Sequence, residues 1–138
     1  MKTLRSALVA FAVLFVATAA HAQTTKVQAT IPFNFMVGDH QYPAGDYLFS
    51  NSGVVLRVTD TETGHTPQMI LSEACQKTIR ADKSELVFNE MGGYYFLQQI
   101  WVAGSSWGRE LPTSKSEIRL AQNHDKSNEV IVAAILVK

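Results

Sequence analysis

Cysteine is almost absent from this chain, because Cys75 is the only one among 138 residues. A single cysteine cannot form an internal disulfide, so the fold has to be held together by packing alone. Free cysteine is among the most buried residue types, and we therefore expect an inert, buried thiol. Pairing with a second chain and a reactive or metal-binding role are the alternatives.

An excess of charge of either sign is also lacking, with 12 Lys and Arg against 12 Asp and Glu. Without a basic cluster there is no electrostatic footprint for nucleic acid and no polybasic membrane patch, so neither is expected as a partner. The histidines beyond residue 22 show no H-x-H or H-E-x-x-H spacing, and the sequence DTETG at 60–64 lacks the remaining ligands of a calcium loop. The sequence thus predicts no metal and no cofactor.

The first 22 residues have the order of a secretory signal peptide. Lys2 and Arg5 precede an apolar or small run over 7–20, and Ala20-His21-Ala22 follows as an A-x-A cleavage site. The run is shorter than the roughly 20 apolar residues of a membrane-spanning helix, although an uncleaved anchor remains the alternative. We expect cleavage after Ala22, which leaves 23–138 as a single exported domain, periplasmic or extracellular, with no membrane span.

Period-two alternation dominates the chain from Lys26 onward. Apolar side chains occupy the odd positions of 27–35, which is typical of a strand with one buried face, and Pro32 within it indicates an edge strand or a bulge. Clusters containing Gly38, Gly45 and Gly53 predict turns between short strands at 47–49, 54–58 and 68–72. Residues 85–89 and 94–102 form the clearest hairpin, and the second of these strands is apolar enough to be central.

The last third of the chain changes character. Ser114 precedes Glu117 by three residues, the spacing of a capping box, and predicts a helix over 115–123 with a modest apolar side formed by Ile118, Leu120 and Ala121. Residues 130–137 are all apolar, which favours a strand buried on both faces; at an edge the run would invite aggregation, so it must pair inside the domain or across a subunit interface. Residues 73–84 are predicted as a long loop or one short helix.

These patterns predict a mainly β fold, a small antiparallel β-barrel or β-sandwich of about seven or eight strands with one short helix near 115–123.

Three segments carry a resemblance. IPFNFMVGDHQYPAGDY (31–47), LVFNEMGGYYFLQQIW (86–101) and GRELPTSKSE (108–117) make the chain similar to a group of small exported bacterial proteins of uncharacterised function. Their signature runs I-P-F-x-F-x-V-G, P-A-G-x-Y and G-R-E-L-P-x-S-K. The resemblance implies a compact β domain in the cell envelope or outside the cell, and no catalytic residue can be carried over from it.

A catalytic interpretation starts from Gly104-x-Ser106-x-Gly108, which has the spacing of a nucleophile elbow, with Glu110 or Glu117 and then His124 downstream. An elbow needs a helix immediately behind the serine, and here Pro112 intervenes before the predicted helix. We therefore expect a turn rather than an active site, and no enzyme. A small serine-dependent hydrolase using Ser106 is the alternative.

Binding residues are better candidates than catalytic ones. Tyr and Trp bury area while keeping a polar handle, and Tyr95, Trp101 and Trp107 are the rings that we consider, with Trp107 foremost because it lies in a Gly- and Ser-rich loop. Arg109 either pins this loop through a carboxylate or carbonyl, or forms with Trp107 a recognition spot for an anionic or aromatic group. The expected function is binding of a protein partner or a small apolar or aromatic ligand, and a homo-oligomer is a further candidate.

Overall fold

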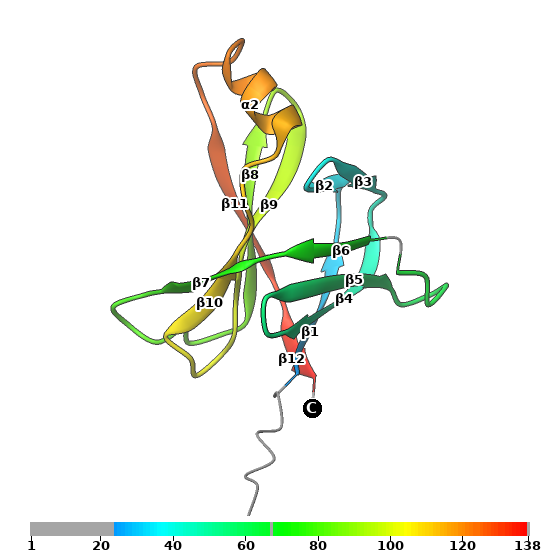
Figure 1. The fold of residues 1–138 in the computed structure, drawn as a ribbon, viewed down its shortest axis with the longest axis vertical. Coiled ribbons are helices and arrows are strands. Elements are labelled where there is room, and N and C mark those ends of the chain that lie inside the picture. Colours follow the sequence, from blue (N-terminus) through cyan, green and yellow to red (C-terminus); the bar gives the residue numbers. More distant parts are fainter. Residues whose placement is uncertain (1–23, 67, 138) are drawn as a thin grey trace, which may run out of the picture.

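A computed structural model of the chain describes residues 24–66 and 68–137, and it is mainly β. Within these residues there are twelve strands and one helix (Figure 1). The expected signal peptide over 1–22 lies outside the described residues. In the described part of the chain, no helix is both long enough and apolar enough to cross a membrane.

The first sheet has five strands that are antiparallel to their neighbours. Their order across the sheet is β12 (Ile135–Val137), β1 (Thr25–Ile31), β4 (Gly45–Ser52), β5 (Val55–Asp60) and β6 (Gln68–Leu71).

The second sheet is built around the predicted hairpin, which is confirmed. Its main path runs β11 (Asn128–Ala133), β8 (Glu85–Met91), β9 (Tyr94–Trp101), β10 (Trp107–Glu110) and β7 (Glu73–Gln76), all antiparallel. A small hairpin of β2 (Phe35–Val37) and β3 (His40–Tyr42) attaches to β9 through one parallel pairing, Met36 with Phe96. The strand β9 is therefore central, as its sequence predicts.

The edge strands of one sheet continue directly into the edge strands of the other. Strand β6 passes into β7 at Ser72, and β11 passes into β12 at Ala134, so that each pair forms one nearly continuous run in Figure 1. Backbone hydrogen bonds hold both passages: the Ser72 N–H donates to the Val54 carbonyl at 2.8 Å, and the Ala134 N–H donates to the Ser84 carbonyl at 2.9 Å. Strands that change sheets in this way form the corners of orthogonally packed sheets.

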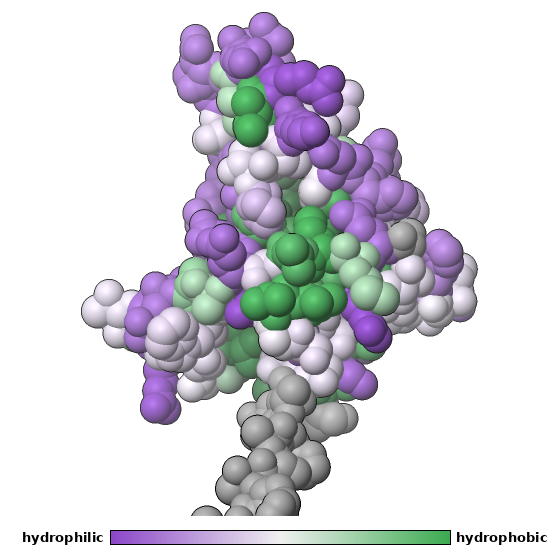
Figure 2. Space-filling view, in the orientation of Figure 1, coloured by the Kyte–Doolittle hydropathy of each residue, from purple (hydrophilic) through white to green (hydrophobic). Residues whose placement is uncertain are grey.

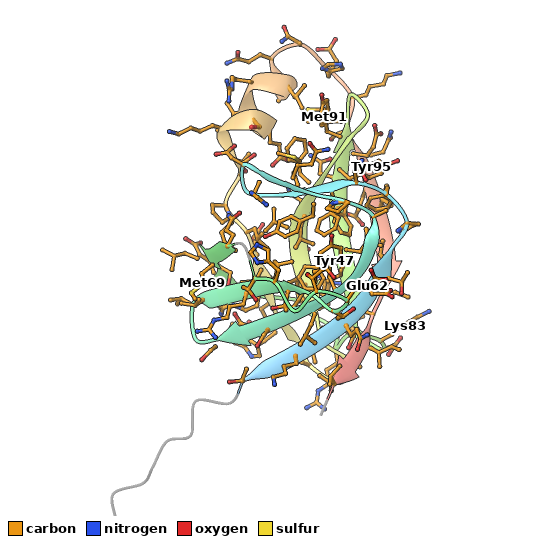
Figure 3. The ribbon with its side chains drawn as sticks, turned by 90° about the vertical axis from the view of Figure 1, so that its right-hand side faces the viewer. Tyr47, Glu62, Met69, Lys83, Met91 and Tyr95 are labelled. Atoms are coloured by element: carbon orange, nitrogen blue, oxygen red, sulfur yellow. The ribbon has the colours of Figure 1, made fainter. Side chains whose placement is uncertain are left out.

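The core lies between the sheets. In β1 the alternate residues Val27, Ala29 and Ile31 are buried, as the period-two pattern predicts. Figure 3 shows the side chain of Tyr47 pointing inward between the sheets, whereas Met69 of β6 points out into solvent. Around Met69, an apolar patch covers the outer side of β5 and β6 (Figure 2); its exposed members are Val54, Met69 and Leu71.

Two features of the predicted sheets are wrong in detail. The prediction of seven or eight strands is too low for two reasons. The chain passes from one sheet to the other at Ser72 and at Ala134, and each passage divides a long extended run into two strands. In addition, β7 occupies part of 73–84, for which a loop or helix is predicted. Pro32 does not mark an edge strand: β1 ends at Ile31, before the proline, and lies between β12 and β4. A proline just beyond the last strand residue removes no ladder hydrogen bond.

The one helix of the described residues, α2 (Lys115–Ala121), ends two residues earlier than predicted. The predicted cap is confirmed, since the Ser114 hydroxyl accepts from the Glu117 N–H at 3.1 Å. The predicted apolar side is wrong: Ile118 is half exposed, and Glu117 is buried instead. The Glu117 carboxylate accepts hydrogen bonds from the side-chain amides of Asn89 at 2.9 Å and Gln98 at 2.7 Å, which compensate its removal from water.

The apolar run over 130–137 is not buried on both faces, contrary to the prediction. It supplies β11 and β12, and each is an edge strand with one partner. Alternate side chains consequently face solvent, and Ile131 and Ile135 are 55% and 73% exposed. The two halves of the run belong to different sheets, and Val130, Val132 and Ala134 are the residues of the run that pack against the core.

Candidate functional site: an apolar cleft between the sheets

A cleft of about 370 Å³ opens between the two sheets and is mostly apolar. We call it the inter-sheet cleft. Val27, Phe49 and Leu56 of the first sheet form one wall, and all three are fully buried. Ile100 and Val102 line the facing wall at the end of β9. The volume lies within the range of roughly 300–1,000 Å³ that is usual for small-molecule sites.

Strand β10 brings two of the predicted binding residues to this cleft. Trp107 and Arg109 are two positions apart, so their side chains leave the strand on the same face, and both line the cleft. Trp107 stays 55% exposed at its rim. Thr25, Asn51 and Ser105 add neutral polar groups, which leaves Arg109 as the only charged residue of the lining within 24–66 and 68–137.

Arg109 also fixes the corner where the chain changes sheets. Its Nε donates to the Ser72 hydroxyl at 3.1 Å, and its Nη2 donates to the Ser72 carbonyl at 2.8 Å. Ser72 is buried, and its hydroxyl could not reach water without opening this corner. The sequence suggested two roles for Arg109, holding its loop through a carboxylate or carbonyl, or recognising a ligand together with Trp107. The structure shows the contact with a carbonyl, and it also places the Arg109 side chain at the border of the cleft.

Trp101 does not reach the cleft. It alternates with Ile100 and Val102, so its ring lies on the opposite face of the second sheet, where it is almost fully buried. The ring packs over Gly108, and the Lys77 ammonium lies 4.0 Å from the ring centroid. Its role is in packing.

Tyr95 lies elsewhere again. It stacks on Phe33 with ring centroids 3.9 Å apart, and Phe33 in turn meets Phe88 edge to face at 5.1 Å. In Figure 3 Tyr95 is in the upper half of the molecule, whereas the start of β1, which borders the cleft, is at the lower end. The structure thus brings together Trp107 and Arg109 of the four candidate residues and separates them from Tyr95 and Trp101.

The segment around Ser106 has the geometry of a turn. The carbonyl of Ser105 accepts from Ala81 N–H at 2.9 Å, that of Ser106 accepts from Lys77 N–H at 2.8 Å, and the Ser105 hydroxyl accepts from Trp107 N–H at 3.0 Å. Strand β10 follows at once, whereas an elbow requires a helix there. The side chain of Ser106 is not part of the cleft lining.

Of the two acids considered for a triad with Ser106, Glu110 ends the strand β10 that follows the serine, whereas Glu117 and the candidate base His124 are engaged at the other end of the molecule. Glu117 is bound by the amides of Asn89 and Gln98, and the His124 ring lies against Gly92, with its Nδ1 3.1 Å from the Leu120 carbonyl. In Figure 1 α2 and the loop after it are at the top, and the segment joining β9 to β10 is at the bottom. The described residues do not bring these three groups together.

The remaining candidates for reactivity in the described residues are metal-binding side chains and the thiol of Cys75. No group of three or more His, Cys, Asp or Glu side chains among them could hold a metal ion. Cys75 on β7 is half-buried opposite Gly108, and burial, with a smaller contribution from Glu110, raises the pKa of its thiol. A raised pKa keeps the thiol protonated and less nucleophilic.

Sequence reasoning missed the walls of the cleft. Val27 and Leu56 are expected to be buried from their alternation, but nothing local indicates that they border an opening. Ser72 carried no signal beyond its place at the end of a predicted strand. A comparison of the chain with protein-family models, curated proteins and solved structures finds no match.

Proposed function

We propose that this protein is an exported, non-enzymatic β domain that binds a small apolar ligand in the inter-sheet cleft. Export rests on the order of the first 22 residues, with cleavage after Ala22. We further infer that the two sheets form an orthogonal sandwich, because their edges are continuous at Ser72 and Ala134 and the sheets do not close into a barrel by hydrogen bonding within the described residues.

The observation that carries the binding proposal is the half-exposed indole of Trp107 at the rim of an apolar cleft. Leaving a large aromatic surface in water is unfavourable, and a ligand that covers it recovers the hydrophobic free energy. The walls of the cleft are already buried in the core, so the ligand would enter a largely preformed site. Ser106, the residue considered as a nucleophile, is outside this lining.

A neutral apolar fluorophore, N-phenyl-1-naphthylamine, tests the proposal. Purified from the cell envelope or medium, with its mass checked for cleavage after Ala22, the protein should bind the fluorophore with a rise in emission. Trp107→Ala should weaken binding about tenfold or more, because it removes the exposed aromatic surface that the ligand covers.

Tyr94→Ala is the matched control, since Tyr94 is an exposed aromatic outside the cleft lining, and it should bind the fluorophore as the unmodified protein does. Absence of binding, or equal affinity in Trp107→Ala and Tyr94→Ala, would contradict the proposal.

A further inference from the structure

We propose that the ligand of the inter-sheet cleft is an amphiphile with one anionic group, of the carboxylate class, which binds the Arg109 guanidinium while its apolar part covers Trp107 and the apolar walls. This inference rests on the proposed binding function and specifies the chemistry of the ligand.

The charge of the lining gives the first argument. Among the residues that the structure describes, Arg109 is the only charged one that borders the cleft, so the described lining carries a single positive charge among apolar walls. Among the described residues the only ion pair is Lys77 with Glu85, at 3.2 Å, and Arg109 has no carboxylate within ion-pair distance. Glu110 follows Arg109 in the strand, and its side chain therefore leaves on the opposite face. A ligand anion would provide the missing counter-charge.

The hydrogen bonds of Arg109 give the second argument. A guanidinium has five N–H donors in a rigid plane. Ser72 takes one donor from Nε and one from Nη2, which fixes the plane and leaves the donors of Nη1 without a partner among the described residues. A cation held in place by buried backbone loses little side-chain entropy when it binds an anion, so the charge is pre-organised.

The rest of the cleft excludes an ion without an apolar part. Phe49, Leu56 and Ile100 offer no donors, and the other polar groups of the lining are neutral. A small hydrated anion would give up water for one guanidinium edge only, whereas an amphiphile gains from the charge and from covering the exposed Trp107 ring and the partly exposed Val102.

Three ligands separate these contributions when each competes with bound N-phenyl-1-naphthylamine: decanoate below its micelle concentration, decanol and acetate. Decanoate should displace the fluorophore about tenfold or more better than decanol, because a hydrogen bond to a charged group stabilises more than a neutral one. Acetate should not displace it at matched concentrations. Equal displacement by decanoate and decanol would overturn this inference and leave the proposed function intact. If neither displaces the fluorophore, this inference fails, whereas the proposed function is decided by binding of the fluorophore itself and its loss in Trp107→Ala.

Two variants assign the preference to one residue. Arg109→Gln should lose the preference for decanoate over decanol, and its decanol affinity shows whether the cleft has kept its shape. Arg57→Gln removes a positive charge from the exposed side of β5, outside the cleft, and should keep the preference. A decanoate preference that survives in Arg109→Gln would refute the role of Arg109. If Arg109→Gln does not fold, the comparison of decanoate with decanol in the unmodified protein decides, together with Arg57→Gln.

Discussion

Replacement of Gly108 by alanine tests most directly why glycine occupies the last position of the G-x-S-x-G sequence. A Cβ atom at residue 108 would lie 2.6 Å from Cε3 of Trp101 and 2.7 Å from the carbonyl oxygen of Ile100. The backbone of Gly108 does not have a positive φ, so alanine suffers no conformational strain there and the effect is purely steric. In this structure the glycine makes room for a buried tryptophan on the neighbouring strand.

The size of the effect can be worked out from these distances. Contacts between a Cβ and other heavy atoms are ordinary only from 3.4 Å upward, so β10 would have to move away from the Ile100 carbonyl by roughly 0.7 Å. That carbonyl belongs to β9, with which β10 is paired, and it cannot turn aside as a flexible side chain could. Overpacking of this kind costs about 1–3 kcal/mol, which corresponds to a fall in Tm of roughly 4–12 °C for a domain of this size.

Two substitutions at neighbouring residues are the controls. The Tm of all three variants and of the unmodified protein is measured by thermal unfolding with circular dichroism. Gly104→Ala has a strained φ of +79° but nothing within 4 Å of the new Cβ, so it should cost about 1 kcal/mol. Ser106→Ala should leave Tm within about 1 °C, because its hydroxyl makes no hydrogen bond within the described residues. A Gly108→Ala protein that melts like the unmodified one, or a larger loss in Ser106→Ala, would refute the steric argument.

Two more predictions concern the core and the sheet edges. The Tyr42 hydroxyl is buried without a hydrogen-bond partner in the described residues, so Tyr42→Phe should raise the free energy of unfolding in urea at pH 7 by about 1 kcal/mol, and a clear loss would contradict this. Burial also raises the pKa of Tyr42 from 10.0 to about 12, so ionisation of the phenol does not lower the free energy of unfolding below pH 10 and lowers it by about 3 kcal/mol as pH rises through 12. Tyr42→Phe should lack this part of the alkaline loss. At the sheet edge, Ile135→Lys should lower the molecular mass relative to that of the unmodified protein, because a charge on an exposed edge strand opposes pairing between copies. The mass is measured by light scattering after size exclusion. An unchanged mass at all concentrations would exclude association through β12.

Alternation along the chain predicts those parts of the fold that depend on neighbouring residues only. The buried face of β1 and the hairpin of β8 and β9 follow from period two and from Gly92-Gly93 at the turn. Strand β12 could not be placed in this way. An apolar run indicates burial, but which of its residues face the core depends on pairing with β1, about a hundred residues away in the sequence.

The helix shows the same limit on a smaller scale. Its start follows from a local contact, the cap by Ser114, and is predicted correctly. Its buried face depends on Asn89 and Gln98, which come from a different part of the sequence and make the burial of Glu117 favourable over that of Ile118. A side chain that looks like a solvent-facing acid in the sequence is thus the anchor of the helix on the sheet.

The candidate site likewise has parts that the local sequence indicates and parts that depend on how the two sheets pack. Trp107 is singled out in the sequence because it is expected in a Gly- and Ser-rich loop, and this placement is wrong: it is the first residue of strand β10, where it is half exposed. Trp101 has an equally conspicuous ring but sits one position out of phase with the cleft wall, and only the register of β9 against β10 reveals this. The cleft itself is a product of the two-sheet packing, so no single segment of sequence could have indicated it.

Arg109 connects the architecture of the protein to its proposed activity. The same guanidinium holds the corner at Ser72 and supplies the charge of the cleft, so changes to it affect stability and binding together. Trp107 is half exposed and donates no side-chain hydrogen bond within the described residues, so its replacement acts on binding with little effect on folding. A ligand that binds both residues would therefore stabilise the corner by mass action as well as cover the ring. This corner joins the edges of the two sheets, so ligand binding at the rim of the cleft should raise the free energy of unfolding of the whole domain.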